Sequence, residues 1–297
     1  MSDDISRIVS APVSVIPHSR YQTVVRFIWH HRIGATGAMV LLAYAFIALV
    51  VPAIVPRSPN TLSDVALSGP TARYPFGTDN LGRDLLSRCL IGIRISVTVG
   101  LLASAMALVA GSFVGLISGY TGGVVDAVIM RVSDVLIAFP ALLLAIAVVA
   151  AFGAGEVQVS LAISLVFFPV FARLARAGVL NEREREYVLA SRAAGAGPAR
   201  ILFIDISRNV TAPLILQAAL SVGFAVILEA ALSFLGLGLR PPTPSLGSII
   251  SGGRSYMQDN VGMVLIPGTL LTVLVFSLQA TADLLGDWLD PRSQRTG

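Results

Sequence analysis

The sequence predicts an all-α polytopic membrane protein with six transmembrane helices and both termini on the cytoplasmic side. Of its 297 residues, 55% are hydrophobic and only 13% are charged, whereas a soluble domain carries about a quarter charged residues. Long apolar runs with few charges recur along the chain, and a helix needs about 20 such residues to cross a bilayer. Apolar surface on this scale needs lipid around it.

The apolar runs divide the chain into spans and connections. A cytoplasmic tail, residues 1–32, precedes the first span at Ile33–Pro56, and a short tail, residues 293–297, ends the chain. Residues 57–94 form an external loop, and residues 95–292 hold the other five spans. We expect these within Ile95–Val125, Val135–Gly155, Val157–Ala172 (continuing past Arg173 and Arg176), Asn209–Arg240 and Asn260–Ala282. Prolines within three of them are candidate kinks: Pro140, Pro169 and Pro267.

The end of the external loop has the pattern of an amphipathic helix over Thr78–Arg94. Asp79 or Asn80 is a candidate N-cap, and Asp84 can pair with Arg88 one turn later. Four apolar residues recur on one side at helical spacing: Leu81, Leu85, Cys89 and Ile93. We expect this helix to pack on the outer membrane surface and to lead into the second span.

The distribution of arginine predicts the orientation. All 21 basic residues are arginine. The larger share lies in the N-terminal tail, the loop between the second and third spans, the segment between the fourth and fifth spans, and the C-terminal tail. Basic residues are in excess in cytoplasmic loops. Both termini and the segment between the fourth and fifth spans are therefore expected in the cytoplasm.

Residue types exclude several kinds of chemistry. A nucleotide-binding P-loop needs a lysine that reaches the phosphates, and the sequence contains none. Cys89 is the single cysteine, and the three histidines precede the first span, so we expect neither a disulfide nor a metal site of His and Cys. No Ser/His/Asp arrangement falls within the spans. We expect no enzyme activity, no bound cofactor and no nucleic-acid partner.

The segment 181–209 combines many charges with a helix–glycine–helix pattern. Good helix formers run from Arg183 to Ala194, and Gly195 and Gly197 interrupt them. Pro198 suits the first turn of a second helix that runs to Ile204. This order favours a surface that docks onto another protein. The alternative is an ordinary solvated cytoplasmic loop, whose arginines only reflect the excess of basic residues on that side of the membrane.

This segment resembles the cytoplasmic loop of the membrane subunit of ATP-driven ABC importers. The stretch EYVLASRAAGAGPARILFIDISRN matches the family order at Tyr187, Ala190, Arg192, Ala193, Gly195, Arg200, Ile201 and Asn209. It departs from the family pattern at Leu189, Ser191, Asp205 and the pair Ser207-Arg208.

Three further stretches are similar to the peptide and nickel permeases of that class. They are YPFGTDNLGRDLLSRCLIGIRISVTVG at 74–100, ILEAALSFLGLGLRPPTPSLGSIISGGR at 227–254 and LLGDWLDPR at 284–292, with Leu246 where family members commonly have Trp. The resemblance covers roughly residues 25–292. It implies the type I ABC importer permease fold and the second, shorter permease of a pair.

The resemblance also implies the function and the partners. The chain would form a translocation path for di- or oligopeptides together with a homologous permease in a bacterial inner membrane. An external substrate-binding protein would deliver the cargo, and two separate ABC ATPase subunits would use ATP and magnesium. Nickel chelates or another small solute are the alternative cargo. Eight residues are expected to couple the chain to the ATPase: Tyr187, Ala190, Ser191, Arg192, Ala193, Gly195, Arg200 and Ile201.

Glu229 is an acid inside the otherwise apolar fifth span. Acids at membrane depth are costly and usually face a bundle interior or a water-filled path. One hypothesis is therefore a place near the translocation path. The other is a structural hydrogen bond to a neighbouring helix, or a site close enough to the membrane interface to be hydrated.

A transporter of another class, a self-sufficient secondary transporter or channel, is the competing function. Such proteins commonly carry internal repeats and paired broken helices at the bilayer midplane. The sequence shows no repeat and few charges within its spans, which favours the importer subunit.

Overall fold

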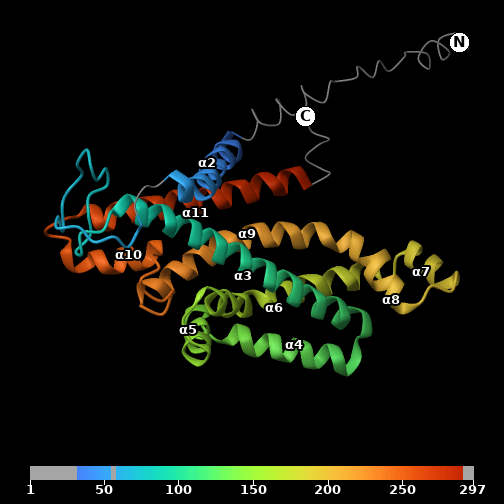
Figure 1. Ribbon diagram of the computed structural model, residues 1–297. Coiled ribbons are helices and arrows are strands. Elements are labelled where there is room, and N and C mark those ends of the chain that lie inside the picture. The colour runs from blue at the N-terminus through green and yellow to red at the C-terminus, as the bar shows by residue number, and fades with distance from the viewer. Residues whose placement is uncertain (1–31, 55–57, 290–297) are drawn as a thin grey trace, which may run out of the picture.

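A computed structural model describes residues 32–54 and 58–289, and every regular element within these ranges is helical (Figure 1). The all-α prediction is therefore confirmed. The expected tails, except Arg32 at the edge of the first, lie outside the described residues. The elements are α2 (Arg32–Ile54), α3 (Leu85–Thr121), α4 (Gly123–Ala138), α5 (Ala141–Phe152), α6 (Glu156–Glu182), α7 (Glu186–Ala193), α8 (Pro198–Arg200), the π-helical η1 (Ile201–Ile206), α9 (Ser207–Phe234), α10 (Leu246–Gly253), the short 3-10 helix η2 (Arg254–Tyr256) and α11 (Gly262–Leu289).

Six helical segments of the described chain are compatible with the six predicted spans. Four helices are long and apolar enough to cross a membrane: α3, α6, the continuous helix Pro198–Phe234, and α11. Helices α4 and α5 pass the same test together as one broken span. Helix α2 is apolar over Ile33–Phe46 and supplies the sixth segment.

The third span, expected over Val135–Gly155 with a candidate kink at Pro140, is broken into two helices. Helices α4 and α5 meet at an angle of 99°, and the break falls at Phe139, whose φ of −83° and ψ of 136° are extended. A proline disfavours helical backbone in the residue before it, and Pro140 follows here. Pro169 and Pro267, in contrast, lie inside uninterrupted helices. Arg131, the arginine of the predicted loop between the second and third spans, lies within α4, so this part of the chain is helical.

The amphipathic helix expected from Thr78 begins later, at Leu85. Asp84 is the N-cap, and its carboxylate accepts a hydrogen bond from the Ser87 backbone N–H at 3.2 Å. Before it, Gly82 has a φ of +73° and makes a turn. Arg88 contacts Asp79 at 3.4 Å instead of Asp84. Leu81 therefore lies outside the helix and is exposed, whereas the three later members of its apolar series are buried: Leu85, Cys89 and Ile93.

Helices α3 and α6 run in the same direction and pack backbone to backbone. Glycines recur every four residues along α3 at the contact: Gly111, Gly115 and Gly119. A Cβ at Gly115 would lie 2.2 Å from the Ala172 carbonyl oxygen, which no side chain tolerates. Small residues allow such close approach between helices in lipid. This pair forms the centre of the bundle, and α4 and α5 make the connection between its two members.

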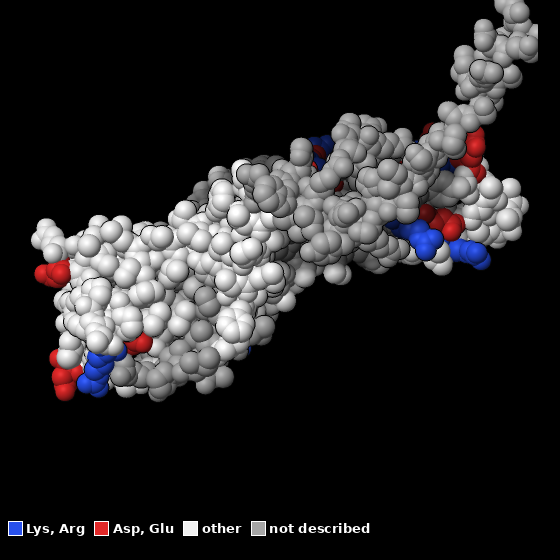
Figure 2. All heavy atoms as spheres, turned by 90° about the horizontal axis from the view of Figure 1, so that it is seen from above, with Lys and Arg blue, Asp and Glu red and all other residues white. Residues whose placement is uncertain are grey.

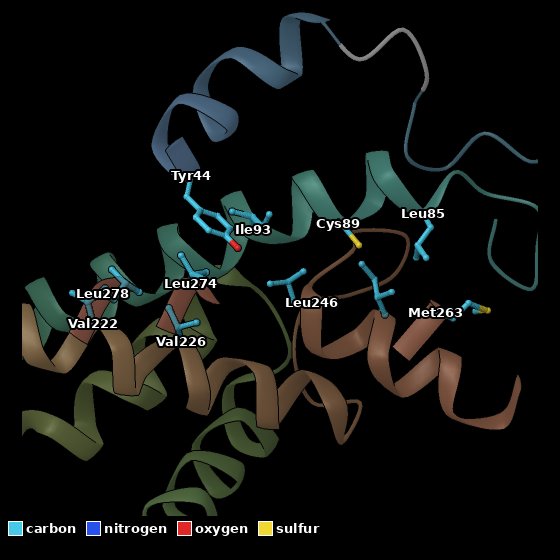
Figure 3. Packing of buried hydrophobic residues seen from close by; sticks show 11 residues of the cluster. Tyr44, Leu85, Cys89, Ile93, Val222, Val226, Leu246, Met263, Leu274 and Leu278 are labelled. Atoms are coloured by element: carbon cyan, nitrogen blue, oxygen red, sulfur yellow. The ribbon is translucent and has the colours of Figure 1, made fainter. Parts of the chain in front are cut away.

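A buried apolar cluster joins α3, α9, α10 and α11 to the first helix, α2 (Figure 3). Tyr44 of α2 enters this cluster, and its hydroxyl donates to the Leu270 carbonyl at 3.0 Å. The cluster consists of Tyr44, Leu85, Cys89, Ile93, Val222, Val226, Leu246, Ile249, Met263, Leu274 and Leu278. It ties the first and last helices to the centre of the bundle.

The start of α2, the end of α11 and the connection between α6 and α9 lie toward the same end of the bundle (Figure 1). A Cβ at Gly34 of α2 would touch Leu284 of α11, and a Cβ at Gly286 would lie near Leu216 of α9. Figure 2 shows acidic and basic side chains at both ends of the molecule. This arrangement places the entry to the first span and the exit from the last one on the side of the charged segment 181–209.

Candidate functional site: the 181–209 hairpin

The segment 181–209, here called the hairpin, begins at the end of α6 and continues into a short helix that is followed by a glycine turn. Helix α7 covers Glu186–Ala193, and Gly195 has a φ of +81°. The Gly195 N–H donates to the Arg192 carbonyl at 3.0 Å, and the Ala196 N–H donates to the Ser191 carbonyl at 3.1 Å. These two bonds form a Schellman motif, in which the left-handed residue is usually glycine.

The reason for glycine at position 195 is its backbone angle. A Cβ added to Gly195 would meet no atom of this chain within 4 Å, so no steric clash within the chain requires glycine here. A side chain there would instead have to adopt a left-handed conformation, which costs about 1–2 kcal/mol. The open space around Gly195 leaves its surface free for a partner.

The second half of the hairpin is not a separate short helix. It starts as expected, with Gly197 as the N-cap and Pro198 at the first helical position. From there, α8, η1 and α9 form one helix from Pro198 to Phe234. No glycine or proline stands between Ile204 and Asn209, so nothing in the local sequence ends the helix before the fifth span. The hairpin therefore continues directly into a membrane-spanning helix.

An apolar cluster lies beneath the hairpin and anchors it. Val188 of α7 is fully buried there, beside Ile201 and Ile206 of η1. The other buried members are Leu202 of η1 and seven residues of α3, α6 and α9: Ala107, Leu116, Phe171, Ala175, Val179, Val210 and Leu214. On the same element, the Phe203 ring stacks on Phe113 of α3 with ring centroids 5.9 Å apart. The hairpin thus packs onto α3, α6 and α9.

Three polar side chains join α7 to both neighbouring spans. The Tyr187 hydroxyl donates to the Glu182 carboxylate at 2.6 Å. The Asn209 amide donates to the same carboxylate at 3.1 Å and to the Tyr187 oxygen at 2.9 Å. Burial and the Glu182 carboxylate raise the pKa of the Tyr187 phenol. The phenol therefore stays protonated near neutral pH and remains a donor.

A second polar contact joins α7 to η1. The Ser191 hydroxyl donates to the Asp205 carboxylate at 2.7 Å. Both residues depart from the family pattern at their positions, and the structure brings them together. The occurrence of both departures in the same segment is the signal in the sequence that could have indicated this contact.

Three of the eight predicted coupling residues are buried or hydrogen-bonded through their side chains within the chain, and the other five are exposed. Ile201 is buried and cannot touch a partner with its side chain in this conformation. Tyr187 and Ser191 use their hydroxyls within the chain. Tyr187 is nevertheless exposed, at 38%. The other five are exposed as well: Ala190, Arg192, Ala193, Gly195 and Arg200. Leu189, which is not among the eight predicted residues, is also exposed next to them.

Glu229 lies apart from the hairpin and is completely buried between helices. Its carboxylate accepts hydrogen bonds from Ser96 of α3 and Ser233 of α9, each at 2.7 Å. These contacts favour the structural hypothesis for Glu229 over a place on the translocation path. Among the described residues, no group of three or more His, Cys, Asp or Glu side chains could hold a metal ion.

Comparison with a solved structure agrees with this fold. The chain resembles the inward-facing methionine ABC transporter MetNI with a TM-score of 0.55 at 19% identity, over 69% of this chain and 96% of that one. At this level of identity the likeness concerns the fold. It supports the predicted type I importer permease architecture.

Sequence comparisons extend over nearly the whole chain. The chain is 39% identical to the di/tripeptide transport system permease protein DppC of Pseudomonas aeruginosa, over 95% of this chain and 97% of the relative. It is 42% identical to the dipeptide transport system permease protein DppC of Escherichia coli, over 97% of each. Residues 111–295, which include the hairpin, match the model of the binding-protein-dependent transport system inner membrane component. The chain therefore belongs to the family of binding-protein-dependent transport system inner membrane components, as a multi-pass permease.

Proposed function

We propose that this chain is one of two homologous permease subunits of an ATP-driven importer, and that its cargo is di- or oligopeptides. The observation that carries the proposal is the near full-length similarity to relatives named as dipeptide and di/tripeptide permeases. The proposed location is a bacterial inner membrane, with the hairpin in the cytoplasm. An external binding protein delivers the peptide to the path between the two permeases.

In this proposal two separate ABC ATPase subunits dock against the hairpin and hydrolyse ATP with magnesium. The absence of lysine supports this division of labour, because the chain cannot supply the P-loop lysine. The exposed hairpin surface supports it as well, since small side chains such as Ala190 and Ala193 allow close approach and Arg192 and Arg200 offer cations. This chain binds no cofactor of its own.

Purification of the complex and reconstitution in liposomes test the proposal. We expect the chain to co-purify with a second permease and two ATPase subunits. Dipeptide, presented with the binding protein, should stimulate ATP hydrolysis by this complex and should accumulate in the liposomes. The chain alone should show neither activity.

Two results would redirect the assignment. Peptide uptake by this polypeptide alone would support the self-sufficient transporter. An ATPase that responds to a nickel chelate and not to peptides would keep the importer architecture and change the cargo. Mass spectrometry of the ligand on the co-purified binding protein distinguishes these cargoes directly.

A further inference from the structure

The contacts of α7 fall on one face of this short helix. Tyr187, Val188 and Ser191 are the residues that touch the rest of the chain. Ser191 comes four positions after Tyr187 and three after Val188, and residues with these separations are neighbours on a helix surface, so these three residues share one face. The remaining side chains of α7 include four exposed residues: Leu189, Ala190, Arg192 and Ala193. The helix therefore has a held face and a free face.

The held face connects α7 to two spans that the hairpin separates in the sequence. Tyr187 reaches Glu182 at the end of α6 and Asn209 near the start of α9. Ser191 reaches Asp205, which stands in the same continuous helix as α9. An eight-residue helix is not stable alone in water. Its position relative to α6 and α9 therefore depends on Val188 and on these hydrogen bonds.

We propose that Tyr187 and Ser191 are positioning residues, which clamp α7 to α6 and α9 so that the three helices move as one body. The proposal rests on the proposed function, because it concerns how the hairpin passes the motion of an ATPase to the membrane. A docked partner grips the free face of α7. The clamp then carries the displacement into both spans instead of letting α7 pivot.

The clamp assigns different work to residues that the sequence placed in one contact set. Tyr187 and Ser191 act through three partners in the clamp. Glu182 and Asp205 accept their hydrogen bonds, and Asn209 donates to Tyr187 and Glu182. Leu189 joins Arg192 and Ala193 on the free face. Loss of a free-face side chain should weaken docking of the ATPase. Loss of a clamp hydrogen bond should leave docking intact but reduce the movement of α6 and α9 for each ATP hydrolysed.

Uptake per ATP hydrolysed in the reconstituted complex tests the clamp. We expect Ser191→Ala and Tyr187→Phe to keep the ATPase subunits bound and ATP hydrolysis running. Uptake per ATP should fall roughly fivefold for Ser191→Ala, which loses one hydrogen bond that contributes about 1 kcal/mol. It should fall at least as far for Tyr187→Phe, which loses the hydrogen bonds to Glu182 and Asn209. Ser191→Thr keeps the hydroxyl and is the matched control that should retain normal coupling. Leu189→Ala, on the free face, should instead lower ATPase co-purification.

Hydrogen exchange measures the clamp without reference to transport. In the purified wild-type complex the amides of α7 should exchange slowly, and in Ser191→Ala they should exchange several-fold faster, with α6 and α9 unchanged. This readout holds even if the complex carries another cargo, so a failure of the proposed function and a failure of the clamp can be told apart.

Three outcomes would overturn the proposal. One is unchanged uptake per ATP in the double variant Tyr187→Phe/Ser191→Ala. Another is loss of ATPase binding in Ser191→Ala, which would make this side chain a direct contact, as the sequence suggested. The third is unchanged exchange of the α7 amides in the same variant.

Discussion

Ser96 of α3 donates a hydrogen bond of 2.7 Å to the Glu229 carboxylate of α9, although the two residues are 133 positions apart in the sequence. Both side chains are buried. Ser233, one turn along α9, occupies the other carboxylate oxygen. The acid of the fifth span therefore has its partners within this chain and joins two spanning helices.

Glu229→Gln should leave uptake within about twofold of wild type, because the amide oxygen still accepts a serine hydroxyl. Glu229→Leu removes the acceptor for two buried hydroxyls, and an unpaired buried donor costs about 1–3 kcal/mol. The thermal midpoint of the purified complex should fall in Glu229→Leu and stay nearly constant in Glu229→Gln. An assembled Glu229→Gln complex without transport would instead place this residue on the translocation path.

Gly195→Val and Gly195→Asp should keep membrane insertion and lose ATPase association or transport. The φ of +81° makes any side chain with a Cβ unfavourable there, by about 1–2 kcal/mol. Gly195→Asn is the control, because asparagine visits left-handed backbone more readily. It has the size of aspartate without the charge and should retain most activity. Normal uptake in Gly195→Val would remove the hairpin from the coupling path.

Gly115→Ala should destabilise the chain, because its new Cβ would overlap the Ala172 carbonyl oxygen at 2.2 Å. Overpacking of this kind costs about 1–3 kcal/mol or more. Gly268→Ala, in α11, is the matched control, since no atom lies within 4 Å of that Cβ. Detergent-solubilised yield and thermal unfolding measure both variants. Equal stability of the two would contradict the close packing of α3 on α6.

Arg176→Ala should loosen α4 from α6. The Arg176 guanidinium donates to both oxygens of Asp126, at 2.5 and 2.6 Å, and such two-pronged pairs are the strong ones among ion pairs. Arg176→Lys keeps the charge but cannot form the bidentate pair of hydrogen bonds with Asp126. Its thermal midpoint should therefore lie between those of wild type and Arg176→Ala. The exchanged pair Asp126→Arg/Arg176→Asp should recover part of the loss. No change in Arg176→Ala would mean that apolar packing alone holds α4.

The sequence by itself determined the class of the protein and the position of the hairpin. Apolar runs near Ile33, Ile95 and Asn260 predicted helices that are present, because composition and length are local properties. The left-handed break at Gly195 and the helix start at Pro198 also follow from single residues whose backbone preferences are strong. The absence of lysine excluded a P-loop without any structure.

Only the tertiary structure decided which side chains are partners. The bonds of Ser191 to Asp205 and of Ser96 to Glu229 each join separate helices. The burial of Ile201 likewise depends on the helices that pack around it. The sharp turn between α4 and α5 likewise exceeds the kink that Pro140 alone predicts. Helical periodicity shows which face of a helix is apolar, and it carries no information on which other helix covers that face. That pairing depends on how the whole bundle packs.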